Sequence, residues 1–421
     1  MIDVKKIRED FPMYKNFHPK NGYPLTYLDN AATTFKPWEV IKAEEAYYTS
    51  FTANSHRGDY ELAHDVDVMF ENARETTRKF INAKLPSEIC FTSGASMSLN
   101  LIAYGLAHIL KPGDEIILSE AEHASNVLPW FGIAKNTGAI IKYAPLDPNK
   151  GIVTPENLLK VINSKTKIVA LAEVTNLKKL KDLKANVLGG LNDSKTLAKI
   201  AHQYNALFVV DGAQSVPHVK IDVQDMDCDF LAFSGHKLCG PTGIGVMYGK
   251  YELLKDMPPL LSGGGMNTRF DTCGDILLQK PPLKFEAGTQ NIAGVLGLEA
   301  AIKYIEKIGI DNIQEHEHKL HEFAISELSK LDNVTIYNPY ASTGIITFNI
   351  NGVFAQDAAT YLGSKGVFVR SGQHCAKILM DFLKTSATIR ASTYFYNDEE
   401  DIKRLVGACK NGGNFLDAYF I

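Results

Sequence analysis

Residues 229–237 read DFLAFSGHK, an apolar run that stops at a serine, a histidine and a lysine. Short runs of this kind recur between about residues 88 and 250 and alternate with helical patterns; they read EICFTSG, DEIILSE, KIVALAEV, LFVVDGA and GIGVMYG. This alternation predicts an α/β fold, with a mostly parallel sheet and crossover helices. Ligands of such sheets bind at the carboxyl ends of the strands. The polar residues that end these runs therefore predict one site; they are Ser93-Gly94, Glu120–His123, Asp211 and Ser234–Lys237.

A smaller unit is predicted downstream. After the glycine-rich SGGGM (262–266), a long amphipathic pattern runs from about Gly294 to Leu331. The segments GIITFNI, DAATYLGSKG, VFVRS and ATIRASTYFYN follow, before a last helix capped near Asn397-Asp398. We expect a large domain over residues 24–305 and a smaller α+β domain over residues 306–421, with residues 1–23 packed against the smaller one.

The composition argues against several functional classes. The 421 residues are 45% apolar and 22% charged, which is typical of a globular protein. The net charge of −4 does not indicate a basic surface for binding nucleic acid. No apolar run is long enough to span a bilayer, and MIDVKKIREDFPMY lacks the apolar core of a secretory signal. The cysteines form no CxxC pair, which argues against a zinc knuckle or a disulfide framework and favours a reducing cytoplasm; they are Cys90, Cys228, Cys239, Cys273, Cys375 and Cys409.

Lys237 and Asp211 indicate the chemistry of the site. A lysine at the end of a buried strand is desolvated, which lowers its pKa and frees an amine that forms a Schiff base with a carbonyl compound or with pyridoxal phosphate. Asp211 ends the run LFVVD, and a carboxylate there needs a positive partner, such as a protonated pyridinium nitrogen. A surface lysine and a turn-capping aspartate are the simpler alternatives, but they leave Gln214 and His236 unexplained.

A phosphate site is predicted beside these residues. The segment 93–96, Ser-Gly-Ala-Ser, joins a strand to a helix, so its backbone N–H groups and the Ser96 hydroxyl can meet an anion. Ser234 and His236 add donors from a second strand end, and His123 can lie flat against an aromatic ring. Each feature alone is common in turns. Their predicted meeting at one sheet edge favours a cofactor site.

Eight stretches carry a family resemblance. The sequence resembles the group II (SUF-type) cysteine desulfurases of the class V aminotransferase superfamily. The matching stretches run in order from about residue 25 to residue 410; they are YLDNAATT (27–34), NSHRG (54–58), SEAEHASNVLPW (119–130), VDGAQSVPH (210–218), CDFLAFSGHKLCGPTGIGV (228–246), FEAGTQN (285–291), VRSGQHCA (369–376) and IRAS (389–392). The stretch around the lysine is highly specific by itself.

The resemblance implies a fold type I enzyme that uses pyridoxal 5'-phosphate to convert L-cysteine to L-alanine. The sulfur would remain as an enzyme persulfide for transfer, for example to iron–sulfur cluster assembly. Lys237 would hold the cofactor, Asp211 would pair with its ring nitrogen, and Gln214 would bond its phenolic oxygen. His123 would stack on the ring and move protons. The phosphate would be bound by Ser96, Ser234, His236 and, from the second subunit of a homodimer, Thr289.

The resemblance also implies how substrate and partners bind. Arg390 would hold the substrate carboxylate through a bidentate pair. His56 and Arg57 would reach the neighbouring site of the homodimer. The expected partners are L-cysteine and a sulfur-acceptor protein of the SUF system.

Three features depart from the family pattern. Ala95 stands where a hydroxyl residue is usual, and Gln373 replaces the first of two histidines before the cysteine. About ten extra residues interrupt NLKKLKDLKANVLGG (176–190), so the family's cofactor asparagine is either Asn176 or Asn186. We favour Asn176 because it continues the strand directly. The insert, residues 177–186, alternates leucines with lysines and is expected to be a solvated amphipathic excursion; the alternative is a basic docking element for an acidic sulfur acceptor.

Cys375 is the predicted sulfur-accepting nucleophile. Ser371-Gly372 gives the backbone freedom before it, Gln373 and His374 keep its surroundings polar, and Arg370 would favour a thiolate. The other cysteines are expected to be structural, apart from one rival in a loop, Cys273. Two other functions compete with desulfuration of cysteine. They are a selenocysteine lyase and a catalytically lapsed scaffold that only binds partners.

Overall fold

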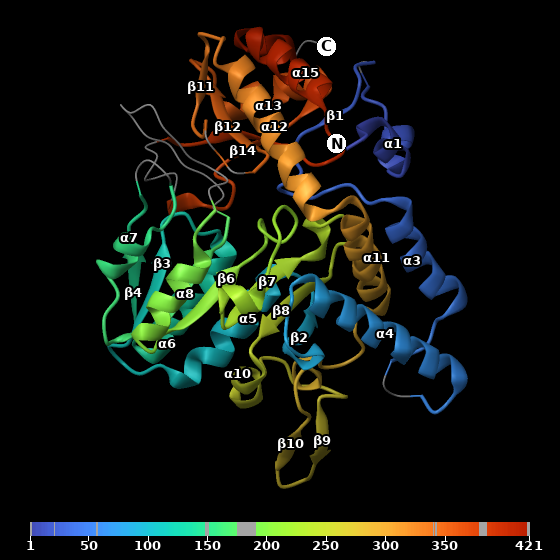
Figure 1. The fold of residues 1–421 in the computed structure, drawn as a ribbon, viewed down its shortest axis with the longest axis vertical. Helices are drawn as coiled ribbons and strands as arrows, with labels where there is room; N and C mark the ends of the chain where they lie inside the picture. Colours follow the sequence, from blue (N-terminus) through green and yellow to red (C-terminus); the bar gives the residue numbers. More distant parts are fainter. Residues whose placement is uncertain are drawn as a thin grey trace.

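The computed structural model describes residues 2–20, 22–55, 58–147, 151–174, 191–339, 341, 343–378 and 385–418. A large unit contains a seven-stranded sheet, and a smaller unit above it contains a four-stranded sheet (Figure 1). The order of the large sheet is β2-β8-β7-β6-β5-β3-β4. Neighbouring strands are parallel except at β8, which is antiparallel to both β2 and β7. The strands are β2 (Ile89–Thr92), β3 (Glu115–Ser119), β4 (Ile140–Ala144), β5 (Thr166–Ala172), β6 (Leu207–Asp211), β7 (Phe230–Ser234) and β8 (Gly245–Gly249).

Both faces of the large sheet are covered. Along β6, Phe208 and Val210 enter one hydrophobic core, whereas Val209 enters the other. Strands buried on both faces have near-continuous apolar sequences, so polar side chains collect at the strand ends. The predicted α/β fold with a mostly parallel sheet is confirmed. The helices that contribute to the first core include α4 (Glu61–Phe80), α8 (Ser194–Gln203) and α11 (Ile292–Ile308); those of the second include α5 (Ala95–Leu106) and α6 (Leu128–Thr137).

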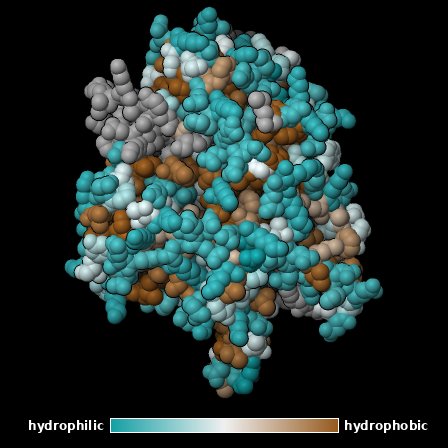
Figure 2. All heavy atoms as spheres, in the orientation of Figure 1, coloured by the Kyte–Doolittle hydropathy of each residue, from teal (hydrophilic) through white to brown (hydrophobic). Residues whose placement is uncertain are grey.

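A hairpin projects from the large unit, and the sequence patterns did not predict it. It consists of β9 (Asn267–Phe270) and β10 (Ile276–Leu278), which pair antiparallel (Figure 1). Its exposed apolar side chains form a patch on the projection in Figure 2; they are Phe270, Ile276 and Leu277. Further helices of the chain are α2 (Pro12–Asn16), α3 (Trp38–Ser50), α7 (Pro155–Leu159), α9 (Val223–Met226) and α10 (Tyr251–Asp256).

The smaller unit is antiparallel. Its sheet has the order β11-β12-β15-β14, with strands β11 (Val334–Ile336), β12 (Ile345–Ile350), β14 (Arg370–Gly372) and β15 (Thr388–Ser392). Its core also takes side chains from α12 (Ile310–Leu328), α13 (Ala355–Ser364) and α15 (Glu399–Lys410). The amphipathic pattern expected from Gly294 to Leu331 is divided between α11 and α12, because Gly309 takes a φ of 90° between them.

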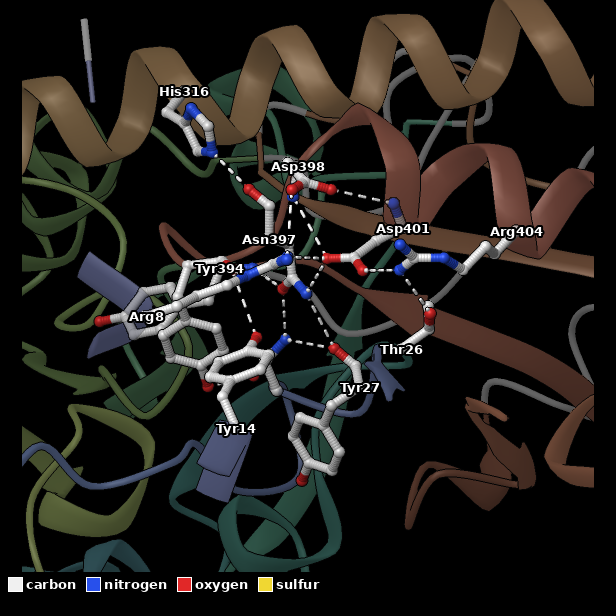
Figure 3. A network of polar contacts seen from close by, with 12 residues as sticks. Arg8, Tyr14, Thr26, Tyr27, His316, Tyr394, Asn397, Asp398, Asp401 and Arg404 are labelled. Carbon is white, nitrogen blue, oxygen red and sulfur yellow. Dashed lines mark hydrogen bonds and ion pairs between the residues drawn. The ribbon is translucent and has the colours of Figure 1, made fainter. Parts of the chain in front are cut away.

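A polar network joins the N-terminal segment to the smaller unit (Figure 3). Arg8, on α1 (Val4–Glu9), donates to the Tyr396 carbonyl at 2.8 Å and pairs with Asp401 at 2.6 Å. Asn397 donates to Asp401 at 2.9 Å and to the carbonyl of Tyr27 at 3.0 Å. Tyr27 lies on β1 (Thr26–Tyr27), which pairs in parallel with β13 (Val367–Phe368).

The domain boundary between residues 305 and 306 stays a prediction.

Two negative findings apply to the ranges that the structure describes. None of their helices combines the length and the apolar character needed to cross a membrane. Their His, Cys, Asp and Glu side chains form no group of three or more that could hold a metal ion.

Candidate active site

A cavity of about 220 Å³ lies where strands of the large sheet end and the smaller unit approaches them. The large unit contributes most of the predicted cofactor residues: Ser96, His123, Asp211, Gln214, Ser234, His236 and Lys237. The smaller unit contributes Arg370, His374, Cys375 and Arg390. The structure thus brings together residues that lie far apart in the sequence, such as Ser96 and Arg390.

Four predicted residues are not in this group. Thr289 lines a separate cavity with Ser93 and Gly243. Three others lie outside the described residues, as does the insert 177–186; they are His56, Arg57 and Asn176. The alternative asparagine, Asn186, also lies outside them.

Lys237 combines a buried position with access to the cavity. It ends the short η4 turn (Gly235–Lys237) that follows β7. Threonines of the stretch YLDNAATT support this turn, since the hydroxyls of Thr33 and Thr34 donate to the His236 carbonyl at 3.2 and 3.0 Å. Burial disfavours the ammonium and lowers the pKa of Lys237 to about 8, although Asp211 opposes the shift. About half of the Lys237 amine is therefore neutral at pH 8, where an ordinary lysine is almost fully protonated.

Asp211 and Gln214 place acceptor groups on the cavity wall. Asp211 is 5% exposed at the end of β6, and its Oδ1 accepts the Ala213 amide at 3.0 Å. Gln214 donates from Nε2 to the Ala31 carbonyl at 2.9 Å. Its Oε1 is buried and has no hydrogen-bond partner among the described residues. Buried polar atoms are normally paired, so a ligand with a donor group at this position would complete the site.

His123 is a neutral ring on the cavity wall. Its Nδ1 accepts the Ser125 amide at 3.1 Å, so Nε2 carries the proton. Burial lowers the pKa of His123 below its ordinary value. His236 is neutral for the same reason, with a pKa lowered to about 4. The two imidazoles therefore act as neutral donors at physiological pH.

The predicted phosphate site lies at the N-terminus of α5. Ser96 lies in its first turn, and its Oγ is 2.6 Å from the Ser125 hydroxyl. Ser234 accepts the Ala95 amide at 2.8 Å. Gly245, on β8, packs closely against the turn that precedes α5. A Cβ added at Gly245 would lie 2.4 Å from the Gly94 Cα. Helix N-termini with free N–H groups attract phosphate, and the two serine hydroxyls are next to these groups.

Arg390 and Arg370 bring two positive charges to the cavity. They are directly opposite each other on β15 and β14. Arg390 is 2% exposed, and its pKa falls to about 10 because of burial, while Asp29 opposes the shift and Arg370 adds to it. Asp29 lies 3.6 Å from the Arg390 guanidinium. Like charges opposite each other on a sheet repel, so a bound carboxylate would relieve this repulsion.

The sequence patterns assigned no individual role to two polar residues of this region, Asp29 and Glu122, and only a partial role to a third, Arg370. Arg370 was considered only for its effect on the thiol, and the strand register that pairs it with Arg390 was not predicted. Asp29 lay unnoticed within YLDNAATT. Glu122, next to His123, accepts the Ser119 hydroxyl at 2.5 Å and the Asn126 amide at 2.8 Å, and burial raises its pKa to about 8.

Cys375 is exposed at the cavity, and the only other exposed cysteine among the described residues is Cys273. Cys273 lies between β9 and β10, on the hairpin that projects away from the smaller unit (Figure 1). Burial raises the pKa of each remaining cysteine; they are Cys90, Cys228, Cys239 and Cys409. A thiolate is disfavoured at those four positions.

Comparisons with known proteins show the family of the chain. The aminotransferase class-V family matches residues 26–405. The chain belongs to this family. It is 46% identical over 408 residues to a probable cysteine desulfurase of Halalkalibacterium halodurans, with 96% of each chain covered. It is 44% identical over 423 residues to one of Staphylococcus aureus, which covers 100% of this chain and 99% of the relative.

A solved structure extends the likeness to the fold. The apo cysteine desulfurase of Thermococcus onnurineus matches with a TM-score of 0.89, 37% identity and 98% of each chain covered. The predicted resemblance to cysteine desulfurases, a pyridoxal phosphate-dependent class of enzyme, is confirmed. The SUF-type subgroup stays a prediction.

Lys237 should titrate far below an ordinary lysine. In cofactor-free protein, acetylation of Lys237 by acetic anhydride should reach half its maximal rate near pH 8, because only the neutral amine reacts. Exposed lysines should require about pH 10.4. Peptide mass spectrometry measures both in one sample. Asp211→Asn should move the midpoint lower still, since the carboxylate favours the ammonium. A midpoint near pH 10 for Lys237 would contradict this description of the site.

Proposed function

We propose that the chain converts L-cysteine to L-alanine with pyridoxal 5'-phosphate on Lys237, and that Cys375 accepts the sulfur as a persulfide. The observation that carries the proposal is the meeting of Lys237, Asp211, Arg390 and Cys375 at one cavity. A buried amine, a buried carboxylate, a carboxylate receptor and an exposed thiol are the groups that this reaction requires.

The described residues fit the cofactor. Asp211 offers a buried carboxylate to a protonated ring nitrogen. The unpaired Oε1 of Gln214 accepts an O–H on the ring, and the N-terminus of α5 with Ser96 and Ser234 accepts a phosphate. Lys237 supplies the amine for covalent attachment. When bound, pyridoxal phosphate supplies an electron sink for the carbon skeleton of the substrate.

The substrate is held by its carboxylate. Arg390 offers a planar fork for two parallel hydrogen bonds, and Arg370 adds a second positive charge on the neighbouring strand. Proton transfer falls to two groups. The Lys237 amine, neutral near pH 8 and above, takes the α-proton, and His123 can donate from Nε2.

In the proposed sulfur transfer, one bond forms at Cys375 and one bond breaks in the substrate. The Cys375 thiolate attacks the substrate sulfur, so that an S–S bond forms while the substrate C–S bond breaks. The electron pair of the broken bond stays on the substrate carbon, and a proton completes alanine. The persulfide then passes its terminal sulfur to an acceptor. The exposure of Cys375 supports transfer to another protein.

The assembly and cellular role are part of the proposal. A homodimer is supported by two features of this chain: Thr289 lies away from the cavity, and the projecting hairpin exposes Phe270, Ile276 and Leu277. In a dimer, Thr289 would reach the phosphate of the other subunit. We further propose a cytoplasmic enzyme of the SUF type, whose acceptor protein carries sulfur toward iron–sulfur cluster assembly.

Arg390→Lys should impair substrate use without loss of cofactor. Lysine keeps the charge but not the bidentate fork, so kcat/KM for cysteine should fall by about tenfold to a hundredfold, equivalent to roughly 1.4–2.8 kcal/mol. Cofactor content should stay at parent level. Arg404→Lys, on α15, is the matched control and should leave kcat/KM unchanged. Parent-like turnover in the Arg390 variant would remove this residue from the substrate site.

Cys375→Ser should separate cofactor binding from sulfur transfer. The variant should bind cofactor and cysteine, yet lose nearly all sulfide release and form no persulfide, because serine cannot accept sulfur. Cys273→Ser, at the other exposed cysteine, should behave like the parent. Mass spectrometry of cysteine-treated protein locates the sulfur. Extra sulfur on Cys273, or normal activity in Cys375→Ser, would overturn the assignment.

A further inference from the structure

The backbone that carries Cys375 has an unusual conformation. His374 and Cys375 have φ values of 50° and 57°, and Gly372 has a φ of 120°. L-residues with side chains seldom adopt the left-handed region, because the Cβ crowds the following carbonyl. Two such residues in succession persist only where the surrounding contacts hold them. The contacts that hold this loop therefore decide where the thiol points.

His374 makes the first of these contacts. Its side chain is 5% exposed, and Nε2 lies 3.1 Å from the Thr388 carbonyl and 3.0 Å from the Thr388 hydroxyl. Because a carbonyl only accepts, Nε2 carries the proton. Thr388 is on β15, opposite Gly372 and two residues before Arg390. Burial, followed by the Arg390 charge, lowers the pKa of His374 to about 3, so this donor keeps one protonation state over the working pH range.

The second contact holds the other side of the loop. The Cys375 carbonyl accepts the Ala124 amide at 2.8 Å, next to His123 of the large unit. The Ala376 amide donates to the Gln373 carbonyl at 2.9 Å. The Ala376 side chain is 2% exposed and packs in the first hydrophobic core of the large unit. The exposed thiol of Cys375 thus lies between two buried neighbours. The backbone freedom that sequence reasoning expected at this cysteine is opposed by fixed contacts on both sides.

We propose that His374 is a positioning residue, which holds Cys375 in its left-handed conformation through the hydrogen bond to Thr388 and so presents the thiol to the substrate sulfur. The inference rests on the proposed role of Cys375 as sulfur acceptor. His374 transfers no proton in this role. Its effect is on geometry alone.

The test compares His374→Asn with the parent holoenzyme. Asparagine tolerates the left-handed region, but its short side chain does not reach Thr388. Persulfide formation on Cys375 in a single turnover should slow by about tenfold to a hundredfold, as expected when a reacting group is displaced by about 1 Å. Cofactor content and the affinity for cysteine should stay unchanged. Thr388→Val, which removes only the hydroxyl, should slow the same step to a smaller extent.

His321→Asn is the matched control. His321 is likewise buried in the smaller unit and bonds a carbonyl, that of Asn338, at 3.1 Å. Its loss should lower stability without slowing persulfide formation. If persulfide formation slowed in both His374→Asn and His321→Asn, the effect would be general destabilisation, and the proposal would be overturned.

The pH dependence of alkylation separates positioning from acid–base action. Iodoacetamide labels the two exposed cysteines, so Cys273 serves as an internal reference for Cys375. The pH midpoint of Cys375 alkylation should be the same in His374→Asn and in the parent. A shifted midpoint, or a parent-like rate of persulfide formation in His374→Asn, would overturn the proposal. If the parent itself forms no persulfide on Cys375, the proposed function fails first, and the two failures are thereby distinguished.

Discussion

Burial of the central strands on both faces is the constraint on which the site depends. Because β6 and β7 have no polar position along their length, their first polar side chains, Asp211 and Ser234, lie at the carboxyl ends. The chain then turns into η4 and places Lys237 beside Asp211. The same packing that forms the hydrophobic core therefore desolvates the lysine and lowers its pKa to about 8. Fold stability and amine reactivity have one physical cause.

The charges around the cavity explain why it suits an anionic ligand. Lys237, Arg370 and Arg390 carry positive charge, whereas Asp211 lines the cavity and Asp29 pairs with Arg390. Burial keeps the histidines of the cavity neutral. The positive charges are incompletely balanced by the described carboxylates, and a phosphate and a carboxylate would supply the missing negative charge. The smaller unit contributes both arginines to the cavity, so the proposed substrate site requires both units.

The sequence predicted the parts that periodicity and strand ends determine. The runs at 207–213 and 229–237 became β6 and β7 with their polar ends in one cavity, as expected for parallel strands. The break at Gly309 was not predicted, because apolar periodicity continues through α11 and α12. Arg370 was missed as a partner of Arg390, because the register between β14 and β15 is set by tertiary packing.

The central claim is that Lys237 and Cys375 serve one reaction, and isotope-labelled cysteine tests it most directly. Purified protein is divided into two portions: one is reduced with borohydride before substrate is added, to fix the cofactor, and the other is treated with L-cysteine carrying heavy sulfur and alkylated without any reductant, and both are analysed as peptides by mass spectrometry. The account predicts the mass of the reduced cofactor on the peptide with Lys237, and one labelled sulfur atom on the peptide with Cys375. Cofactor on another lysine, or labelled sulfur on Cys273 alone, would contradict it.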